Sequence, residues 1–153
     1  MEGGFGKVYK EIGVARYYEK SGEQYSNPHR FDIERLIKRK LAIPNNFLKK
    51  EEKILDLACG SGEATIPLQH LGYKNITGID PYTHLKYEEM TKLKCALHSF
   101  IDILNGVLDE ERYDAIIVSY ALHLVKESML HNFCHKLAEI SKKLIIISPH
   151  KFP

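Results

Sequence analysis

The sequence contains no tryptophan, only three cysteines and no apolar run longer than a β-strand. Cys59, Cys95 and Cys134 are spaced widely and without pattern, so they cannot build a disulfide framework or a paired-cysteine redox or zinc motif. We therefore expect a reducing, cytoplasmic environment and no metal site. The longest apolar runs hold four residues, whereas a membrane-spanning helix needs about 20, so we expect no membrane segment.

An excess of charge is also lacking. Lys and Arg together number 22 and Asp and Glu 20, which gives a formal net charge of +2. This charge is too small to indicate a nucleic-acid partner, although it does not exclude one. The length of 153 residues, with 44% hydrophobic and 27% charged residues, is typical of one globular domain.

Short apolar runs alternate with amphipathic stretches along the chain. The runs predict four buried strands and a weaker fifth one, at residues 54–58, 75–80, 113–119, 143–148 and within 94–101. Because strands that are apolar on both faces need helices on both sides, the pattern predicts an α/β fold with a mostly parallel sheet.

Helices are predicted between these strands, at residues 63–71, 83–93 and 129–140, and ahead of the first strand. Asn27 and Pro28 are typical of an N-cap and a first helical position, and Pro44 ends this first helix. Gly72 is the expected stop of the helix at 63–71. Pro67 lacks a backbone donor and predicts an irregular second turn there.

A glycine-rich turn follows the first predicted strand. Gly60 and Gly62 allow a sharp turn and the close approach of a ligand, and the next helix presents free N–H groups. The second strand ends at Asp80, eighteen residues after Gly62, where a carboxylate can bind the hydroxyls of a ribose. The alternative is a tight turn with an incidental acid, but the order of strand, turn, helix, strand and acid favours a nucleoside-cofactor site.

Residues 55–62, Leu-Asp-Leu-Ala-Cys-Gly-Ser-Gly, resemble motif I of the class I, Rossmann-like S-adenosylmethionine-dependent methyltransferases. The resemblance implies S-adenosyl-L-methionine as the cofactor and methyl transfer as the activity. An NAD-dependent oxidoreductase is less favoured, because Thr65 stands where the dinucleotide fingerprint has a third small residue. Ala58 departs mildly from the family, in which glycine is commoner at this position.

The resemblance also implies a set of cofactor-binding residues. Asp56 and the two glycines match positions at the amino-acid end of the cofactor, Asp80 the ribose and Asp102 the adenine amino group. The segment 113–125 resembles the fourth strand and following loop, beside the transferable methyl group. The full set is Asp56, Ala58, Cys59, Gly60, Gly62, Asp80, Pro81, Asp102, Ile103, Ser119 and Tyr120, and we interpret the Cys59 thiol as a packing group.

Two further assignments concern the methyl acceptor, which is an unidentified small molecule, protein or RNA. His123 is the candidate for polarising or deprotonating the acceptor, and the alternative is a histidine that packs or caps in a loop. Tyr17, Tyr18 and Tyr25 are candidates for a lid that excludes water, and the alternative is the packing of a helix on the sheet edge.

The family fold implies a doubly wound, mostly parallel sheet of order 3-2-1-4-5 with an N-terminal helical cover. We expect a single domain with a flexible tail (1–10), the cover (11–48) and a cofactor-binding core (49–153). Strands six and seven of the usual fold have no counterpart in the sequence. The chain is therefore a minimal five-stranded form, a fragment of a longer product, or a domain in which a partner or second copy covers the edge of strand five. The alternative function is a truncated, non-catalytic methyltransferase-like binding subunit.

Overall fold

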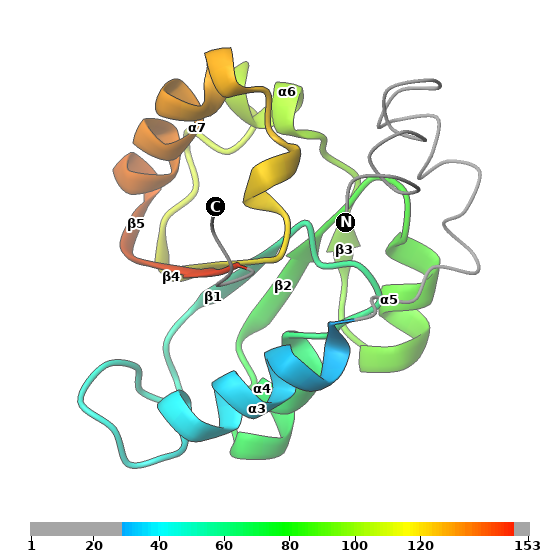
Figure 1. The fold of residues 1–153 in the computed structure, drawn as a ribbon, viewed down its shortest axis with the longest axis vertical. Helices are drawn as coiled ribbons and strands as arrows, with labels where there is room; N and C mark the ends of the chain where they lie inside the picture. Colours follow the sequence, from blue (N-terminus) through cyan, green and yellow to red (C-terminus); the bar gives the residue numbers. More distant parts are fainter. Residues whose placement is uncertain (1–28, 149–153) are drawn as a thin grey trace, which may run out of the picture.

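A five-stranded parallel sheet forms the centre of the computed structural model, which describes residues 29–148. Its order is β3-β2-β1-β4-β5, which confirms the predicted topology (Figure 1). The strands are β1 (Ile54–Leu57), β2 (Ile76–Ile79), β3 (Cys95–Ala96), β4 (Tyr113–Ser119) and β5 (Ser141–Ile147). Residues 1–28 lie outside the described part, and with them the predicted tail, the Asn27 cap and the tyrosines of the predicted lid.

Helices cover both faces of the sheet, as the continuously apolar strands require. The first layer contains α3 (Arg30–Leu41), α4 (Thr65–Leu71) and α5 (His84–Thr91), and the second contains α6 (Phe100–Leu104) and α7 (Glu127–Ile140) (Figure 1). A short 3₁₀ helix, η2 (Leu122–Leu124), leads from β4 towards α7. All four residues of β1 are buried, because this strand lies between β2 and β4 and under both layers.

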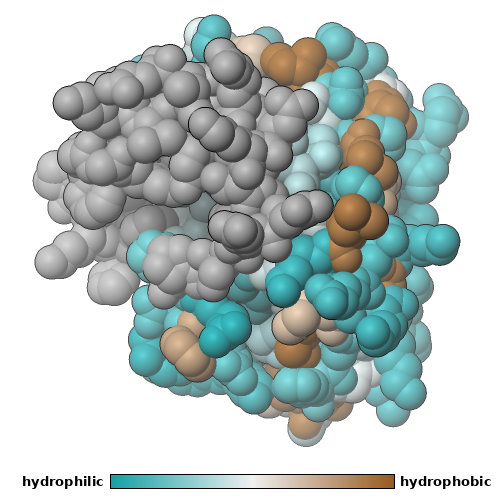
Figure 2. Space-filling view, turned by 90° about the vertical axis from the view of Figure 1, so that its right-hand side faces the viewer, coloured by the Kyte–Doolittle hydropathy of each residue, from teal (hydrophilic) through white to brown (hydrophobic). Residues whose placement is uncertain are grey.

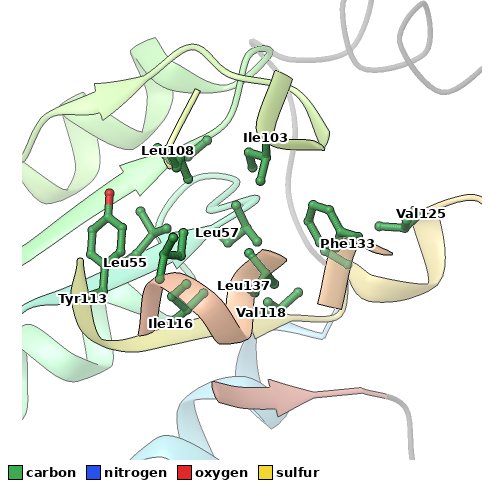
Figure 3. Packing of buried hydrophobic residues seen from close by; sticks show 13 residues of the cluster. Leu55, Leu57, Ile103, Leu108, Tyr113, Ile116, Val118, Val125, Phe133 and Leu137 are labelled. Carbon is green, nitrogen blue, oxygen red and sulfur yellow. The ribbon is translucent and has the colours of Figure 1, made fainter. Parts of the chain in front are cut away.

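Alternate side chains of β1 enter two separate hydrophobic clusters, as the two-residue period of a strand requires. Leu55 and Leu57 pack in the cluster of α6 and α7, where Figure 3 shows them together with Phe133. Ile54 points to the other face and packs in the cluster that contains Ile33 of α3. The residue between the two leucines, Asp56, therefore points into the layer of α3, α4 and α5.

Helix α3 packs on the sheet, and it does not line the cavity at the carboxyl ends of the strands that is described below. Ile33, Ile37 and Leu41 are buried on it at helical spacing, against Ile54 and Ile117 of the sheet. The helix begins at Arg30 with His29 as its N-cap, two residues later than predicted. Its first backbone bond joins Ile33 N–H to His29 O, at 3.0 Å.

Pro67 does not disturb the second turn of α4, so that prediction is wrong. The helix begins at Thr65, which makes Pro67 its third residue, where a backbone N–H has no intrahelical acceptor and its loss costs little. The irregular backbone lies before the helix, in turns over residues 60–64. Gly72 ends the helix as predicted, with a φ of 105°.

Apolar side chains are exposed at several places on the surface. Leu85 and Met90 of α5 and Leu97, just after β3, are between 46% and 64% exposed. Figure 2 views the molecule from the side on which Figure 1 draws α5, and it shows hydrophobic side chains between hydrophilic ones on this face. Among the described residues, no helix is long and apolar enough to cross a membrane.

Candidate functional site

A cavity of about 440 Å³ opens at the carboxyl ends of the strands. Its walls come from the segments that directly follow β1, β2, β3 and β4, and from the start of α7. The strand order reverses between β1 and β4, and open α/β sheets bind ligands in the crevice at such a switch point. Six predicted site residues line the cavity: Ala58, Gly60, Asp80, Pro81, Ser119 and Tyr120.

Asp80 lies at the end of β2 with its carboxylate held by backbone N–H groups. Oδ1 accepts from Tyr82 N at 2.9 Å and from Thr83 N at 3.2 Å, and Oδ2 accepts from Gly60 N at 3.2 Å. Burial raises the pKa of Asp80, and these hydrogen bonds partly offset the rise. The carboxylate is thereby fixed in direction beside the glycine turn, and one of its roughly four lone pairs is left for a ligand.

The turn after β1 contains three residues with left-handed backbone conformations. Ala58 and Gly60 both have a φ of 57°, and Gly62 has a φ of 95°. A Cβ atom on Gly62 would lie 2.6 Å from Thr91 Cγ2, so no larger residue fits there without movement. Ala58 adopts the conformation that glycine adopts without cost, which explains why glycine suits this position.

Cys59 is buried behind this turn rather than in the cavity. Its Sγ lies 3.5 Å from Cys95 Sγ, and burial raises the pKa of the Cys59 thiol. Both thiols pack against Tyr87 of α5. Gly78 of β2 makes room for this cluster, because a Cβ atom on it would lie 2.7 Å from Tyr87 Cζ and 2.8 Å from Cys59 Sγ.

Asp56 also lies behind the turn, outside the cavity lining. It is fully buried and Oδ2 accepts a hydrogen bond from Thr65 Oγ1 at 2.6 Å. Burial raises the pKa of Asp56 to about 8, and the Thr65 bond opposes this rise. Thr65 thus uses its hydroxyl to hold the carboxyl group, at the place where a dinucleotide-binding turn has a small residue that packs closely.

A comparison with protein families decides what kind of domain carries this cavity. The family profile described as a methyltransferase domain matches residues 54–143, which is more than half of the chain. The chain belongs to the methyltransferase domain family. No curated protein matches its sequence.

Solved structures of methyltransferases share the fold of this methyltransferase domain. Magnesium protoporphyrin IX methyltransferase (ChlM) from Synechocystis PCC 6803, with bound SAM, is 16% identical with a TM-score of 0.61 over 92% of this chain and 72% of its own. The DhpI-SAM-HEP complex is 16% identical with a TM-score of 0.63, over 88% of this chain and 59% of its own.

The N-methyltransferase NodS from Bradyrhizobium japonicum WM9, in complex with S-adenosyl-L-homocysteine, is 19% identical with a TM-score of 0.62. The match covers 88% of this chain and 67% of the NodS chain. At these identities the likeness shows the fold. The methyltransferase domain spans 59% to 72% of the length of these three proteins.

The structure does not place Asp102 or Ile103 in the cavity of the methyltransferase domain. Asp102 is exposed and forms a capping box at the start of α6, in which its carboxylate accepts from Ser99 N at 2.8 Å and its N–H donates to Ser99 Oγ at 3.1 Å. The Ser99 N–H lowers the pKa of Asp102. Ile103 is fully buried in the core. Residues 98–101, which directly precede Asp102 in the chain, line the cavity instead.

His123 is exposed on η2 and does not line the cavity, whereas its neighbour Leu124 does. A 3₁₀ helix turns about 120° per residue, so adjacent side chains point in different directions. Contact of His123 with an acceptor therefore stays a prediction. Tyr120, at the end of β4, has a φ of 51° and its ring stacks on His29 at 4.3 Å between centroids.

Sequence reasoning missed several residues of the cavity wall. Tyr82 lies three residues after the end of β2 and His98 two residues after the end of β3, so the rule that ligands bind at the carboxyl ends of parallel strands could have identified them. Phe100 lies on α6 and Met129 on α7. These two carry no local signal, because only the packing of their helices on the sheet brings them to the cavity.

Proposed function

We propose that this methyltransferase domain binds S-adenosyl-L-methionine in the cavity and transfers its methyl group to a nucleophile. The observation that carries the proposal is the carboxylate of Asp80, fixed at the end of β2 and joined to Gly60 N by a hydrogen bond across the cavity wall. Structural neighbours that bind SAM or S-adenosyl-L-homocysteine with the same fold support it.

The cavity fits the chemistry of this cofactor. Asp80 can accept a hydrogen bond from a ribose hydroxyl through the lone pair that its three backbone donors leave free. Phe100, Leu124 and Val125 provide an apolar wall for the adenine ring. Gly60 has no side chain, so the amino-acid end can approach its backbone closely. The volume of about 440 Å³ lies within the usual range for such sites.

The cofactor supplies a methyl group that is already activated on a sulfonium sulfur. The work left to the chain is to hold the two reactants in line and to exclude water. Ser119 and Tyr120 line the cavity at the end of β4 and are the residues that we assign to the wall on the acceptor side. A base is needed only for an acceptor that arrives protonated, and His123 is the candidate for that role.

A second candidate is a non-catalytic methyltransferase-like binding subunit. The open edge of the sheet favours it, because β5 pairs only with β4 within residues 29–148. A groove of about 560 Å³ runs along this edge, between Leu36 of α3, Phe47 and Ile146 of β5. A partner strand or a second copy would pair there. Multiple turnovers in a methyl-transfer screen would exclude this alternative.

The cofactor is tested by calorimetry with S-adenosyl-L-homocysteine and with NAD. We expect heat only with the former, and an Asp80→Ala variant should bind it about ten- to a hundredfold more weakly, because the ribose hydroxyls lose a charged acceptor. The matched control is Asp114→Ala, which removes an acid near the opposite end of the sheet, where Asp114 accepts from Lys53 N at 2.8 Å. A preference for NAD would contradict the proposal, and so would equal affinities of Asp80→Ala and Asp114→Ala for S-adenosyl-L-homocysteine.

A further inference from the structure

An aromatic residue with an unusual backbone conformation directly follows β4. Tyr120 has a φ of 51°, and its N–H donates to Ile147 O of β5 at 2.6 Å. A left-handed conformation is rare for a bulky side chain, and it persists only where the surrounding structure enforces it. Because such strained residues cluster at functional sites, the role of Tyr120 at the cavity is the question that this conformation raises.

The left-handed conformation redirects the ring of Tyr120. Along β4, Ile116 and Val118 pack in the cluster of α6 and α7. Ala115 and Ile117 alternate with them and pack in the cluster of α3. Continued alternation would place Tyr120 with Val118, but Tyr120 packs against the cluster of α3 instead. Since Tyr120 also lines the cavity, it forms the part of the wall that faces α3.

His29, the N-cap of α3, holds this ring from one side. The two rings are stacked, with 4.3 Å between their centroids and 29° between their planes. His29 is fixed at the start of the helix, because its backbone oxygen accepts from Ile33 N at 3.0 Å and its Nδ1 lies 4.0 Å from Asp32 Oδ2. The position of the Tyr120 ring therefore depends on the start of α3.

The strand order indicates where the positive charge of the cofactor lies in the proposed function. The ribose binds at Asp80, which follows β2, and the amino-acid end approaches Gly60, which follows β1. The sulfonium sulfur joins these two parts of the cofactor. It therefore lies at the carboxyl end of β1, beside the glycine turn.

Tyr120 is the neighbour of this turn on the other side of β1. Leu57 of β1 pairs with Val118 of β4, so the glycine turn and Tyr120 follow their strands at the same edge of the sheet. Tyr82 and Phe100, which also line the cavity, follow β2 and β3 on the opposite side of β1. Among these three aromatic side chains of the wall, the one placed next to the sulfonium group is Tyr120.

We propose that the ring of Tyr120 recognises the positive charge of the sulfonium group, and that His29 is the positioning residue that holds this ring at the cavity. The inference rests on the proposed function and extends it to the start of α3, which does not line the cavity. The face of an aromatic ring carries partial negative charge and attracts a cation. S-adenosyl-L-homocysteine has a neutral thioether in place of the sulfonium group, so the ring favours S-adenosyl-L-methionine over it.

The hydroxyl group of Tyr120 is not required for this attraction. Burial raises the pKa of Tyr120, Asp32 adds to the rise and Arg35 opposes it. The hydroxyl therefore stays protonated near neutral pH, and the side chain carries no formal negative charge. The attraction comes from the face of the ring, which phenylalanine also has.

Calorimetry with S-adenosyl-L-methionine and with S-adenosyl-L-homocysteine tests the inference through the ratio of the two affinities. In Tyr120→Leu we expect the preference for S-adenosyl-L-methionine to fall about three- to tenfold, because leucine is apolar but has no π face. Tyr120→Phe should keep the preference. His29→Ala should lower it about two- to threefold, and His29→Phe should restore it, because a phenyl ring can stack on Tyr120.

Tyr82→Leu is the matched control. Tyr82 also lines the cavity, but it follows β2 and lies away from β4. This variant should change the affinities for both ligands by the same factor and leave their ratio as in the wild-type protein. A merely structural role of Tyr120 and His29 predicts the same behaviour for their variants, so a change in the ratio is the result that supports the inference.

The outcomes separate the inference from the proposed function. If the wild-type protein binds neither ligand, the proposed function is wrong. If it binds both and Tyr120→Leu keeps the wild-type ratio, the inference is overturned and the proposed function stands. If Tyr120→Leu does not fold, the two His29 variants decide: a wild-type ratio in His29→Ala overturns the inference, and a lowered ratio that His29→Phe restores supports it.

Discussion

At the scale of single residues, Asp56 is a carboxyl group that the fold keeps out of water. Burial raises its pKa from 3.8 to about 8, so the folded protein binds a proton more tightly than the unfolded chain does between these values. The contribution of Asp56 to the free energy of unfolding is therefore highest below about pH 4, and it falls as pH rises towards 8. The carboxyl group is kept at a cost in stability, which is common at functional sites.

Asp56→Asn should reduce this pH dependence. We expect the variant to be more stable than the wild-type protein at pH 8.5, by an amount of the order of 3 kcal/mol, and to differ little at pH 4. Denaturant unfolding at both pH values measures the difference. Asp114→Asn is the control of opposite sign, because the Lys53 N–H lowers the pKa of Asp114 and its removal should destabilise the protein above pH 4. Equal pH dependence in Asp56→Asn and wild-type protein would show that Asp56 is not desolvated.

At the scale of elements, α6 begins with a capping box that also shapes the cavity. The Ser99 hydroxyl and the Asp102 carboxylate each satisfy a backbone N–H of the other residue. Ser99 lines the cavity and Asp102 does not. The acid that resembles an adenine-binding residue is thus occupied in starting the helix.

Variants of this box distinguish capping from adenine binding. Ser99→Ala should destabilise the protein by about 1 kcal/mol, because the loss of the N-cap hydroxyl leaves the Asp102 N–H without its acceptor. Asp102→Ala should lower the melting temperature by a smaller amount, because the exposed Ser99 N–H can bond to water instead. The affinity for S-adenosyl-L-homocysteine should change by much less in Asp102→Ala than in Asp80→Ala. An Asp102→Ala protein of unchanged melting temperature that binds tenfold more weakly would instead support the adenine contact inferred from the sequence.

At the scale of the whole molecule, the sheet ends in an apolar edge. Ile146 of β5 is 44% exposed beside the open backbone of this strand, and lysine on an edge strand opposes pairing with another chain. Ile146→Lys should therefore reduce concentration-dependent association, measured by light scattering. Met90→Lys is the control, since Met90 is 46% exposed but lies on α5, which has no open strand backbone. If both variants reduce association equally, the added positive charge and not the edge of β5 is the cause.

Much of the fold was predictable because its signals are local. The apolar runs of β1, β2 and β4 and the stop at Gly72 each depend on a few neighbouring residues. Pro67 was expected in the second turn of its helix, but it lies in the first turn of α4, because the start of this helix depends on how the preceding glycine turn closes. β3 was only weakly indicated, and it forms only two residues of strand.

The sequence by itself determined the succession of strands and helices along the chain, the sharp turn around Gly60 and the position of Asp80 at a strand end, since backbone conformation and side-chain period are properties of short segments. Only the tertiary structure decided which side chains meet across the chain: it joined Asp56 to Tyr87, used Asp102 as a cap and directed Leu124 rather than His123 to the cavity. The physical reason is that such contacts depend on how helices pack on the sheet, and no local pattern in the chain records that packing.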